Sequence, residues 1–594
     1  MDSIAGSLET GAAVIARALQ DNGVEHVFMY PGGTIAPLLD ELIKLGITYT
    51  CCRTEQGAGF AALAAAKVSG RPQVCMVTSG PGVTNAVTPV ADAYYDSVPL
   101  ILITGQVATN DINTARRIRQ TGFQETDTIG IYQPVSKLTK RLGLEDPLAE
   151  TVSEIFDVVQ RGRQGPAVIE MPMNIQRSDY TLESRQILSF DHIEKECLPQ
   201  EQPLRKNDLE QVVSLLRNAQ RPLILAGNGL YLAGAVEEFR KFSENARIPV
   251  VSSLPGLGTL PVSDPNAYSF IGYSGEYYAN LALYYADVVL CLGARLDLRQ
   301  TGSELHTFSE NKKIIRVDID QRELDDGRVN GDISIHSDLA NFFEKINSSI
   351  FLSASYTRWH EQILEWKTRF DSSQFYMDED LSSYHVVKTV AEETKQQSLI
   401  VTSGVGTHQQ LVARYFDFDF PSRRWLTSAG HGTMGYDLPA IIGAMKQTKS
   451  HDQGVCFVGD GSFQMNIQEL AVIKEQNLPI KIFVLDNRRL GIVSQFQLQN
   501  WEEDHSTGNK YNPEFTAIAK AYGIPAFECS HKDQLKTVVS SAFAAEGPAL
   551  IHCRINYNED VKPMLLGGQN LDQMYPFKEV GVLSVKDDRY CQGL

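Results

Sequence analysis

The sequence predicts an α/β protein built from three doubly wound, parallel-sheet domains. Short apolar strands alternate with helical stretches in three long segments, which is typical of parallel sheets with helices on both faces. The length of 594 residues allows roughly three to four domains, and polar stretches with little periodicity separate the segments. We therefore expect domains over residues 1–185, 200–350 and 380–560, and a C-terminal tail over 561–594.

The expected strands are apolar runs that end in small or polar residues. After an N-terminal amphipathic helix, the first segment has strands at 26–30, 73–80 and 99–105 and a small-residue helix at 56–70. The second segment has strands at 221–227, 248–253, 286–293 and 313–320. The third has strands at 398–404, 454–461, 480–487 and 549–555. Linkers with some local structure are expected over 181–206 and 346–380.

Composition excludes several classes of partner. The formal net charge is −18, whereas a nucleic acid or an anionic membrane would need a basic face. No stretch approaches the roughly 18 consecutive apolar residues of a transmembrane helix. The cysteines are scattered and form no Cys-x-x-Cys pair, so the sequence predicts neither a zinc site nor a disulfide framework. This pattern favours a reducing compartment. We expect a cytoplasmic protein that acts on small molecules.

The strongest motif places an acid and an amide at the ends of two neighbouring strands. The sequence GDGS (459–462) follows an apolar strand and precedes an expected helix, and the next strand ends at Asn487. A right-handed crossover brings both strand ends to one edge of the sheet, where ligands of open α/β sheets bind. Asp460 and Asn487 oxygens suit a Mg²⁺ ion that also binds phosphate and water. The turn alone would more often be an ordinary helix start, and the paired spacing favours the metal site.

The sequence GDGSFQMNIQELAVIKEQNLPIKIFVLDN (459–487) resembles the thiamine-diphosphate (ThDP) motif of the acetolactate synthase family. The resemblance covers nearly the whole chain. It implies a pyrimidine-binding domain, a central Rossmann-like domain and a diphosphate-binding domain, in that order. The implied metal ligands are Asp460, Asn487 and the backbone oxygen of Arg489. The implied diphosphate contacts are Gly461, Ser462 and, from VGTHQQ (405–410), Gly406, Thr407 and His408. His408 could instead begin a surface helix.

Glu55 is the candidate activating acid. It stands where an extended stretch meets a Gly/Ala-rich helix, so it could simply cap that helix. The stretches 30–42 and 77–107 resemble the family's pyrimidine-binding domain, which implies that Glu55 activates the cofactor. The further cofactor contacts implied are Pro31, Pro81 and Asn85. Because Glu55 and Asp460 must reach one cofactor, the resemblance implies a homodimer or homotetramer with sites between subunits.

Further motifs surround the reacting end of the cofactor. The segment SAGHGTMGYDLPA (428–440) resembles the family stretch whose methionine supports the bent cofactor, which assigns Met434 and Gly432 there. Met434 could also be core filler. His431 and Asp437 depart from the apolar and small residues usual in the family, and the sequence gives them no role. The implied substrate-side residues are Gly33, Phe123, Gln124 and Lys137, although Lys137 could equally be a solvated lysine.

Two departures from the family affect the acceptor substrate. Met173 stands where the family has a lysine, and Phe496 stands where it has a tryptophan. The first change removes a cation that would attract a second keto acid, and the second enlarges the pocket. The resemblance implies decarboxylation of a 2-keto acid such as pyruvate and transfer of the two-carbon unit to an acceptor carbonyl. A larger ketone or aldehyde acceptor, including a sugar-linked one, stays open, as do simple decarboxylation, acyl transfer and an inactive relative.

The middle segment resembles the family's FAD-binding stretches. AGNGL (226–230), GARLDLRQTG (293–302) and RVDIDQREL (316–324) carry glycine-rich turns and acids after strands, which alone are generic nucleotide-binding features. The implied flavin contacts are Arg163, Gly227, Asn228, Gly229, Arg295 and Asp318. Leu298 replaces a family aspartate. The flavin would be structural, because the carboligation has no net redox step. A separate regulatory subunit is compatible with the resemblance.

Overall fold

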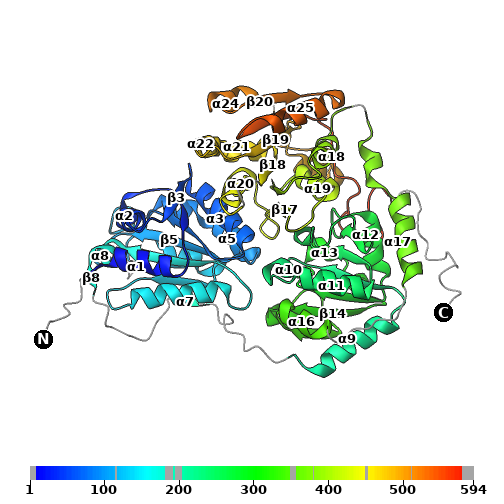
Figure 1. Cartoon of the computed structure of the whole chain (residues 1–594), viewed down its shortest axis with the longest axis horizontal. Helices are drawn as coiled ribbons and strands as arrows, with labels where there is room; N and C mark the ends of the chain where they lie inside the picture. The colour runs from blue at the N-terminus through cyan, green and yellow to red at the C-terminus, as the bar shows by residue number, and fades with distance from the viewer. Residues whose placement is uncertain are drawn as a thin grey trace.

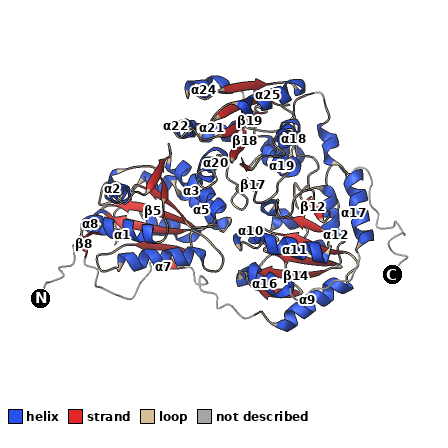
Figure 2. Ribbon diagram, in the orientation of Figure 1, coloured by secondary structure: helices blue, strands red, loops and turns tan. Residues whose placement is uncertain are grey.

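The computed structural model describes residues 9–113, 117–180, 192–193, 204–347, 356–378, 380–448, 452–509 and 511–577. It contains three α/β domains, each with its own mainly parallel sheet, which confirms the expected fold class (Figure 1). Figure 2 shows helices packed around each sheet. Within the described part of the chain, every helix is too short or too polar to cross a bilayer.

The first domain contains a seven-stranded sheet. Its strands are β2 (His26–Met29), β3 (Thr48–Cys51), β4 (Gln73–Val77), β5 (Leu100–Gln106), β6 (Leu138–Arg141), β7 (Ala167–Pro172) and β9 (His192–Ile193). Their order is β3-β2-β4-β5-β7-β6-β9, and only β9 is antiparallel to its neighbour. A short antiparallel pair joins β1 (Glu9–Thr10) to β8 (Asp179–Tyr180). Because β9 belongs to this sheet, the first domain extends beyond the expected boundary at residue 185.

Successive side chains along the strands point to opposite faces of the sheet, and helices pack on both faces. The helices are α1 (Gly11–Asp21), α2 (Ala36–Lys44), α3 (Glu55–Ser69), α4 (Pro81–Asn85), α5 (Val87–Tyr95), α6 (Thr128–Tyr132), α7 (Leu148–Gln160) and α8 (Met173–Arg177). Ile101 and Ile103 of β5 pack with α1, α2 and α7, whereas Leu100 and Leu102 pack with α3 and α5. The expected N-terminal helix is α1, which Thr10 caps by accepting the Ala13 N–H.

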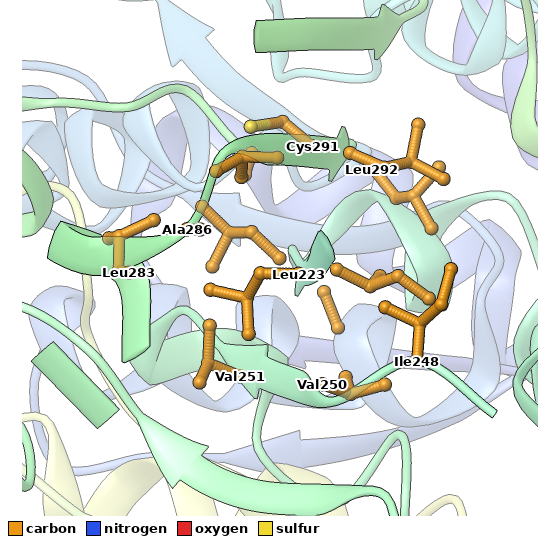
Figure 3. Close-up of a cluster of buried hydrophobic side chains, with 14 of the residues drawn as sticks. Leu223, Ile248, Val250, Val251, Leu283, Ala286, Cys291 and Leu292 are labelled. Atoms are coloured by element: carbon orange, nitrogen blue, oxygen red, sulfur yellow. The ribbon is translucent and has the colours of Figure 1, made fainter. Parts of the chain in front are cut away.

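The middle domain contains six parallel strands. They are β10 (Pro222–Ala226), β11 (Val250–Ser252), β12 (Ala267–Phe270), β13 (Val288–Leu292), β14 (Lys313–Asp318) and β15 (Ile333–His336), in the order β12-β11-β10-β13-β14-β15. This is the winding of dinucleotide-binding sheets. The helices are α9 (Lys206–Asn218), α10 (Gly229–Leu232), α11 (Val236–Ala246), α12 (Tyr277–Tyr285), α13 (Leu298–Thr301), α14 (Leu305–Ser309), α15 (Gln321–Asp325) and α16 (Leu339–Asn347). Figure 3 shows Leu223 of β10, Val251 of β11 and Leu283 of α12 in one cluster of buried hydrophobic side chains.

The expected linker over 346–380 contains a further helix of the middle domain, α17 (Thr357–Arg369). Its Trp359 and Trp366 side chains are buried in the middle-domain core with ring centroids 5.7 Å apart. The Trp359 indole N–H donates to the Pro222 carbonyl at 3.1 Å. The middle domain therefore extends beyond the expected boundary at residue 350. Burial of two aromatic side chains on one face of α17 stabilises its packing on this domain, despite the many charged residues around them.

The third domain repeats the winding of the first. Its strands are β16 (Leu399–Ser403), β17 (Arg423–Leu426), β18 (Gln453–Gly459), β19 (Ile480–Asp486), β20 (Ala526–Cys529) and β21 (Ala549–Arg554), all parallel, in the order β17-β16-β18-β19-β21-β20. Its helices are α18 (Ser383–Glu393), α19 (Thr407–Tyr415), α20 (Asp437–Met445), α21 (Asp460–Met465), α22 (Leu470–Glu475), α23 (Gly491–Asn500), α24 (Phe515–Ala521) and α25 (Lys532–Ala544). In both domains the second strand in sequence lies at one edge of the sheet.

Helices α3 and α20 join the first and third domains in one shared core. At their crossing, a Cβ on Gly443 would lie 1.8 Å from the carbonyl oxygen of Ala61, so only glycine permits this approach. Nearby, the rings of Phe60 and Tyr436 meet edge to face at 5.6 Å. This contact fixes the two domains relative to each other within one chain.

The described part of the expected C-terminal tail belongs to the middle-domain core. Leu565, Leu571 and Met574 are buried there, and the Leu565 N–H donates to the Tyr273 carbonyl at 2.8 Å. The ring of Phe577 stacks on that of Tyr277 at 5.1 Å. The chain thus returns from the third domain to complete the second. The expected tail beyond residue 577 lies outside the described residues.

Phe577→Ala is expected to destabilise the middle domain by about 3–5 kcal/mol, because it empties a buried aromatic position. The measurement is the midpoint of thermal unfolding followed by calorimetry. Leu364→Ala, at a half-exposed position of α17, is the control and should change stability by less than about 0.5 kcal/mol. Equal midpoints for the two variants would contradict the assignment of this segment to the core.

Candidate active site

A cavity opens at the carboxyl ends of β16, β18 and β19, which are neighbours in the third-domain sheet. Ligands of open α/β sheets bind at this edge. The residues that line it all come from the range 383–559. They include most of the residues that the sequence assigned to the metal, to the diphosphate and to the support of the bent cofactor: Gly406, Thr407, His408, Met434, Asp460, Gly461, Ser462, Asn487 and Arg489.

Asp460 is the best-defined acid of this cavity. It is the first residue of α21. Burial raises the pKa of its carboxyl group, although hydrogen bonds from Asn512 and Asn509 partly oppose this rise. The side-chain amides of Asn509 and Asn512 donate to its Oδ2 at 2.8 and 2.7 Å. The Asn512 amide also donates to Asp486 at 2.8 Å. Neither asparagine is predicted from the sequence, because both lie in irregular chain that carries no strand or helix pattern.

The donor atoms fit a hard divalent cation. Asp460 offers a carboxylate, Asn487 an amide oxygen and Arg489 a backbone carbonyl, which is the oxygen set that Mg²⁺ takes when phosphate and water complete its shell. Among the residues that the structure describes, no group of three or more His, Cys, Asp or Glu side chains could hold a metal. An ion at Asp460 would therefore share its remaining positions with a bound ligand.

Two glycines with left-handed backbones shape the turn that carries Met434. Gly432 has φ of +74° and Gly435 has φ of +80°, values that strain other residues. The Gly435 N–H donates to Ser462 Oγ at 2.8 Å and so joins this turn to the first turn of α21. A Cβ on Gly461 would lie 3.6 Å from the Met434 methyl group. The missing side chain leaves room at the cavity floor for close approach of a ligand.

Glu55 lies at the equivalent edge of the first-domain sheet. The helix cap that it could have supplied comes from Thr54, whose Oγ1 accepts the Gly57 N–H at 2.9 Å. The Glu55 carboxylate is 7% exposed and accepts from the Asn85 amide at 3.0 Å. Asn85 and Pro81 are the ends of α4, which follows β4. Three of the expected cofactor contacts are therefore adjacent.

Glu55 and Asp460 lie in separate half-sites of one chain. Every residue lining the Asp460 cavity comes from the third domain, and Glu55 faces Asn85 within the first domain. The shared core between α3 and α20 holds the two domains in this arrangement. One chain alone thus does not place both groups around one cavity.

The substrate-side residues lie near the start of α4. Pro31 and Gly33 follow β2, which pairs with β4, and a Cβ on Gly80 would meet the Gln124 side chain at 2.9 Å. Gln124 has φ of +63°, a strained backbone for a residue with a side chain, and such strain is concentrated at functional sites. Phe123 is 84% exposed, so its ring is available for contact.

Lys137 does not face this region, which corrects the expectation that it lines the substrate pocket. Its side chain is buried, and its ammonium group donates to the carbonyls of Val158 and Arg161 at 2.6 and 2.7 Å. These carbonyls lie at the end of α7, where a cation is favourable. The role of Lys137 is therefore to stabilise that helix end.

The two residues that depart from the family at the acceptor side are accessible. Met173 is the partly exposed first residue of α8. Phe496 is 49% exposed on α23, and its ring meets Trp501 edge to face at 5.9 Å. This aromatic pair lies just after the turn that contains Asn487 and Arg489.

A cavity of about 430 Å³ lies at the carboxyl ends of the middle-domain strands, and residues of all three domains line it. It is lined by the expected flavin residues Arg163, Asn228, Gly229, Arg295 and Asp318. Gly227 does not line the cavity but packs against Gly293, which does: a Cβ on Gly227 would lie 2.0 Å from the Gly293 carbonyl oxygen. Arg163 pairs with Asp320 and Glu323 at 3.1 and 2.8 Å. Burial raises the pKa of Asp318 to about 6.

The structure places the two residues that the sequence left without a role. The exposed ring of His431 stacks on Tyr95 with centroids 5.4 Å apart, between the third and first domains. The adjacent Gly430 N–H donates to Asp96 at 2.7 Å. Asp437 is fully buried and contacts His408 and Ser462.

Asp460→Asn is expected to weaken the binding of ThDP in the presence of Mg²⁺ by about tenfold to 100-fold, because an amide holds the ion less tightly than a carboxylate. Isothermal titration with ThDP at fixed Mg²⁺ measures the affinity. Asp533→Asn, at an exposed position of α25, is the control. Unchanged affinity in Asp460→Asn would remove this residue from the metal site.

Family models cover most of the chain. Residues 9–131 match the thiamine pyrophosphate enzyme N-terminal TPP binding domain. Residues 209–346 match the thiamine pyrophosphate enzyme central domain. Residues 404–553 match the thiamine pyrophosphate enzyme C-terminal TPP binding domain. The matched order follows the three domains of the structure.

Three proteins similar to this chain are named for the same activity. The chain is 34% identical over 565 residues to the acetolactate synthase isozyme 2 large subunit of Escherichia coli, covering 95% of this chain and 99% of that protein. It is 35% identical over 573 residues to the acetolactate synthase large subunit of Lactococcus lactis, covering 95% and 96%. It is 33% identical over 579 residues to the probable acetolactate synthase large subunit of Methanocaldococcus jannaschii, covering 96% and 95%. The chain is therefore a thiamine-pyrophosphate-dependent enzyme and belongs to the acetolactate synthase family.

Proposed function

We propose that this enzyme decarboxylates pyruvate and transfers the two-carbon unit to an acceptor carbonyl, with ThDP held through Mg²⁺ at Asp460, Asn487 and the Arg489 carbonyl. The observation that carries the proposal is the convergence of these oxygens with Gly461 and Met434 on one cavity at the strand ends. That cavity joins metal donors, backbone N–H groups and an apolar support, which is the chemistry that ThDP requires. The names of the relatives support the same reaction.

Each residue has a definite task in this proposal. ThDP supplies, when bound, an electron sink for the carbanion character that decarboxylation creates. Gly461 and the turn around Gly406 bind the diphosphate through backbone N–H groups. The Glu55 carboxylate, held by the Asn85 amide, would form a hydrogen bond to the pyrimidine ring of the bound cofactor and so favour its activation. Phe123 and Gln124 cover the reacting carbon and exclude water from it.

The proposal requires at least two copies of the chain. Glu55 and Asp460 lie in separate half-sites of one chain, so an isologous pair would complete two equivalent sites. A homodimer or a dimer of dimers satisfies this requirement. The relatives are named large subunits, so a separate regulatory subunit is included among the candidate partners. The free cysteines of the described residues fit the reducing cytoplasm.

The acceptor is expected to be a larger ketone or aldehyde rather than a second keto acid. Met173 brings no positive charge to the site entrance, so a second carboxylate gains nothing there. Phe496 is half exposed beside the metal turn, and its ring is smaller than the indole that it replaces. Both features favour a bulkier, uncharged acceptor, and acetolactate formation from two pyruvates is the competing outcome.

A product screen tests this function. The purified enzyme with ThDP and Mg²⁺ is given pyruvate alone, and then pyruvate with a series of ketones and aldehydes, and the products are identified by NMR. Pyruvate is expected to be consumed, with faster carboligation when a bulky acceptor is present. Glu55→Gln is the control and should lower the rate by about 10²–10⁴-fold while ThDP affinity changes little.

Three outcomes contradict parts of the proposal. Brisk acetolactate formation from pyruvate alone, with no gain from other acceptors, would remove the argument from Met173 and Phe496. Free acetaldehyde as the main product would make the protein a simple decarboxylase. Full activity in Glu55→Gln would remove Glu55 from the reaction.

We further propose that the 430 Å³ cavity at the middle-domain strand ends binds FAD as a structural cofactor. The cavity is lined by Arg163, Asn228 and Asp318, and its volume lies within the ~300–1,000 Å³ range of cofactor pockets. Its position at the ends of β10, β13 and β14 is the nucleotide-binding edge of this winding.

The flavin assignment predicts a yellow protein. Its visible spectrum should show bound flavin that heat releases, and chemical reduction of the flavin should leave the carboligation rate within about twofold, because the reaction has no net redox step. A colourless protein that takes up no added FAD would contradict flavin binding. A rate that collapses on reduction would contradict a structural role.

A further inference from the structure

Asp437 lies directly behind the wall of the diphosphate cavity. It is the first residue of α20 and is 0% exposed. His408 and Ser462 line the cavity in front of it, whereas Asp437 itself does not. Any influence of this carboxylate on a bound diphosphate must therefore pass through its neighbours.

Three donors surround the Asp437 carboxylate. His408 Nε2 lies 3.2 Å from Oδ1, which also accepts the Gly404 N–H. The Ser462 hydroxyl donates to Oδ2. An ionised carboxylate in a buried site needs such a set of donors, because unpaired buried charge is costly. The contacts come from the β16–α19 turn and the β18–α21 turn, so one side chain joins both walls of the cavity.

The hydrogen bonds also fix which atoms of the neighbours remain available. The His408 Nε2–H is directed to Asp437, and the opposite ring nitrogen, Nδ1, lies beside Gly406 and Gly459, where added Cβ atoms would be 2.8 and 3.2 Å away. The Ser462 hydroxyl donates its hydrogen bond to Asp437 and accepts the Gly435 N–H at 2.8 Å. Ser462 can therefore offer a diphosphate its backbone N–H, while His408 presents its Nδ1 edge to the glycines of the two turns.

We propose that Asp437 is a positioning residue for the diphosphate: it holds the His408 ring in one tautomer and orientation and ties the GDGS and GTMG turns together through Ser462. The proposal rests on ThDP binding in this cavity. A carboxylate that orients a ligand-binding histidine from behind is an established device at metal sites. Here it acts behind the proposed diphosphate site, where the orientation of the His408 ring shapes the cavity wall.

Asp437→Asn separates this role from simple packing, because the amide has nearly the same shape. An asparagine cannot accept from all three donors, so one of them must turn away or the His408 ring must change tautomer. The expected result is a rise of about 10- to 100-fold in the dissociation constant for ThDP. At saturating ThDP, kcat should change much less, since the reacting end of the cofactor is unaltered.

The measurement is titration calorimetry of the full chain with ThDP at fixed, saturating Mg²⁺. Glu276→Gln is the matched control: Glu276 is also buried and accepts a hydrogen bond from Ser372 at 2.9 Å, but it lies in the middle domain. It should alter the thermal midpoint without altering ThDP affinity. A double-mutant cycle with His408→Asn should show strong non-additivity, because both substitutions break one pair.

A second measurement needs no Asp437 variant. In the protein labelled with ¹⁵N-histidine, the His408 signal, identified by its loss in His408→Asn, should show the neutral ring protonated at Nε2 at alkaline pH. The opposite tautomer would overturn the proposal, as would Asp437→Asn with ThDP affinity within twofold of the original protein, or additive effects in the cycle. Failure of the unsubstituted protein to bind ThDP would instead overturn the cofactor site itself.

Discussion

The site depends on one geometric constraint: parallel strands that are neighbours in a sheet end at the same edge. Because β16, β18 and β19 are adjacent and parallel, the turns that follow them meet, although they are separated by long helical crossovers. This brings His408, Asp460 and Asn487 to one cavity. The buried side chains beneath these turns hold the edge rigid, so that donor groups stay in place before any ligand arrives.

The first and third domains share their winding, and each begins its longest interface helix with an acid. Glu55 starts α3 after the edge strand β3, and Asp437 starts α20 after the edge strand β17. The two helices then cross at Gly443. Glu55 accepts a hydrogen bond from Asn85 of the first domain, whereas Asp437 contacts His408 and Ser462 beneath the turns of its own sheet. The first residue of the corresponding interface helix thus has different contacts in the first and third domains.

Apolar runs and strand-end motifs made much of the fold and of the third-domain cavity predictable. The strands at 398–404, 454–461 and 480–487 are buried on both faces, so their composition marks them clearly. The sequence could not reveal Asn509 and Asn512, whose contacts with Asp460 depend on tertiary structure alone. It also could not show that Lys137 is buried at a helix end, because a lysine after a strand is usually solvated.

The return of the C-terminal segment to the middle domain has a consequence for synthesis of the chain. Leu565, Leu571, Met574 and Phe577 complete a core whose other buried members precede the third domain in sequence. During translation the middle-domain core therefore cannot be completed until the whole third domain has been synthesised. At ribosomal rates this delays its completion by on the order of ten seconds or more. Throughout that interval its apolar surface around Tyr277 is uncovered, and a nascent chain in this state is a natural client for chaperones.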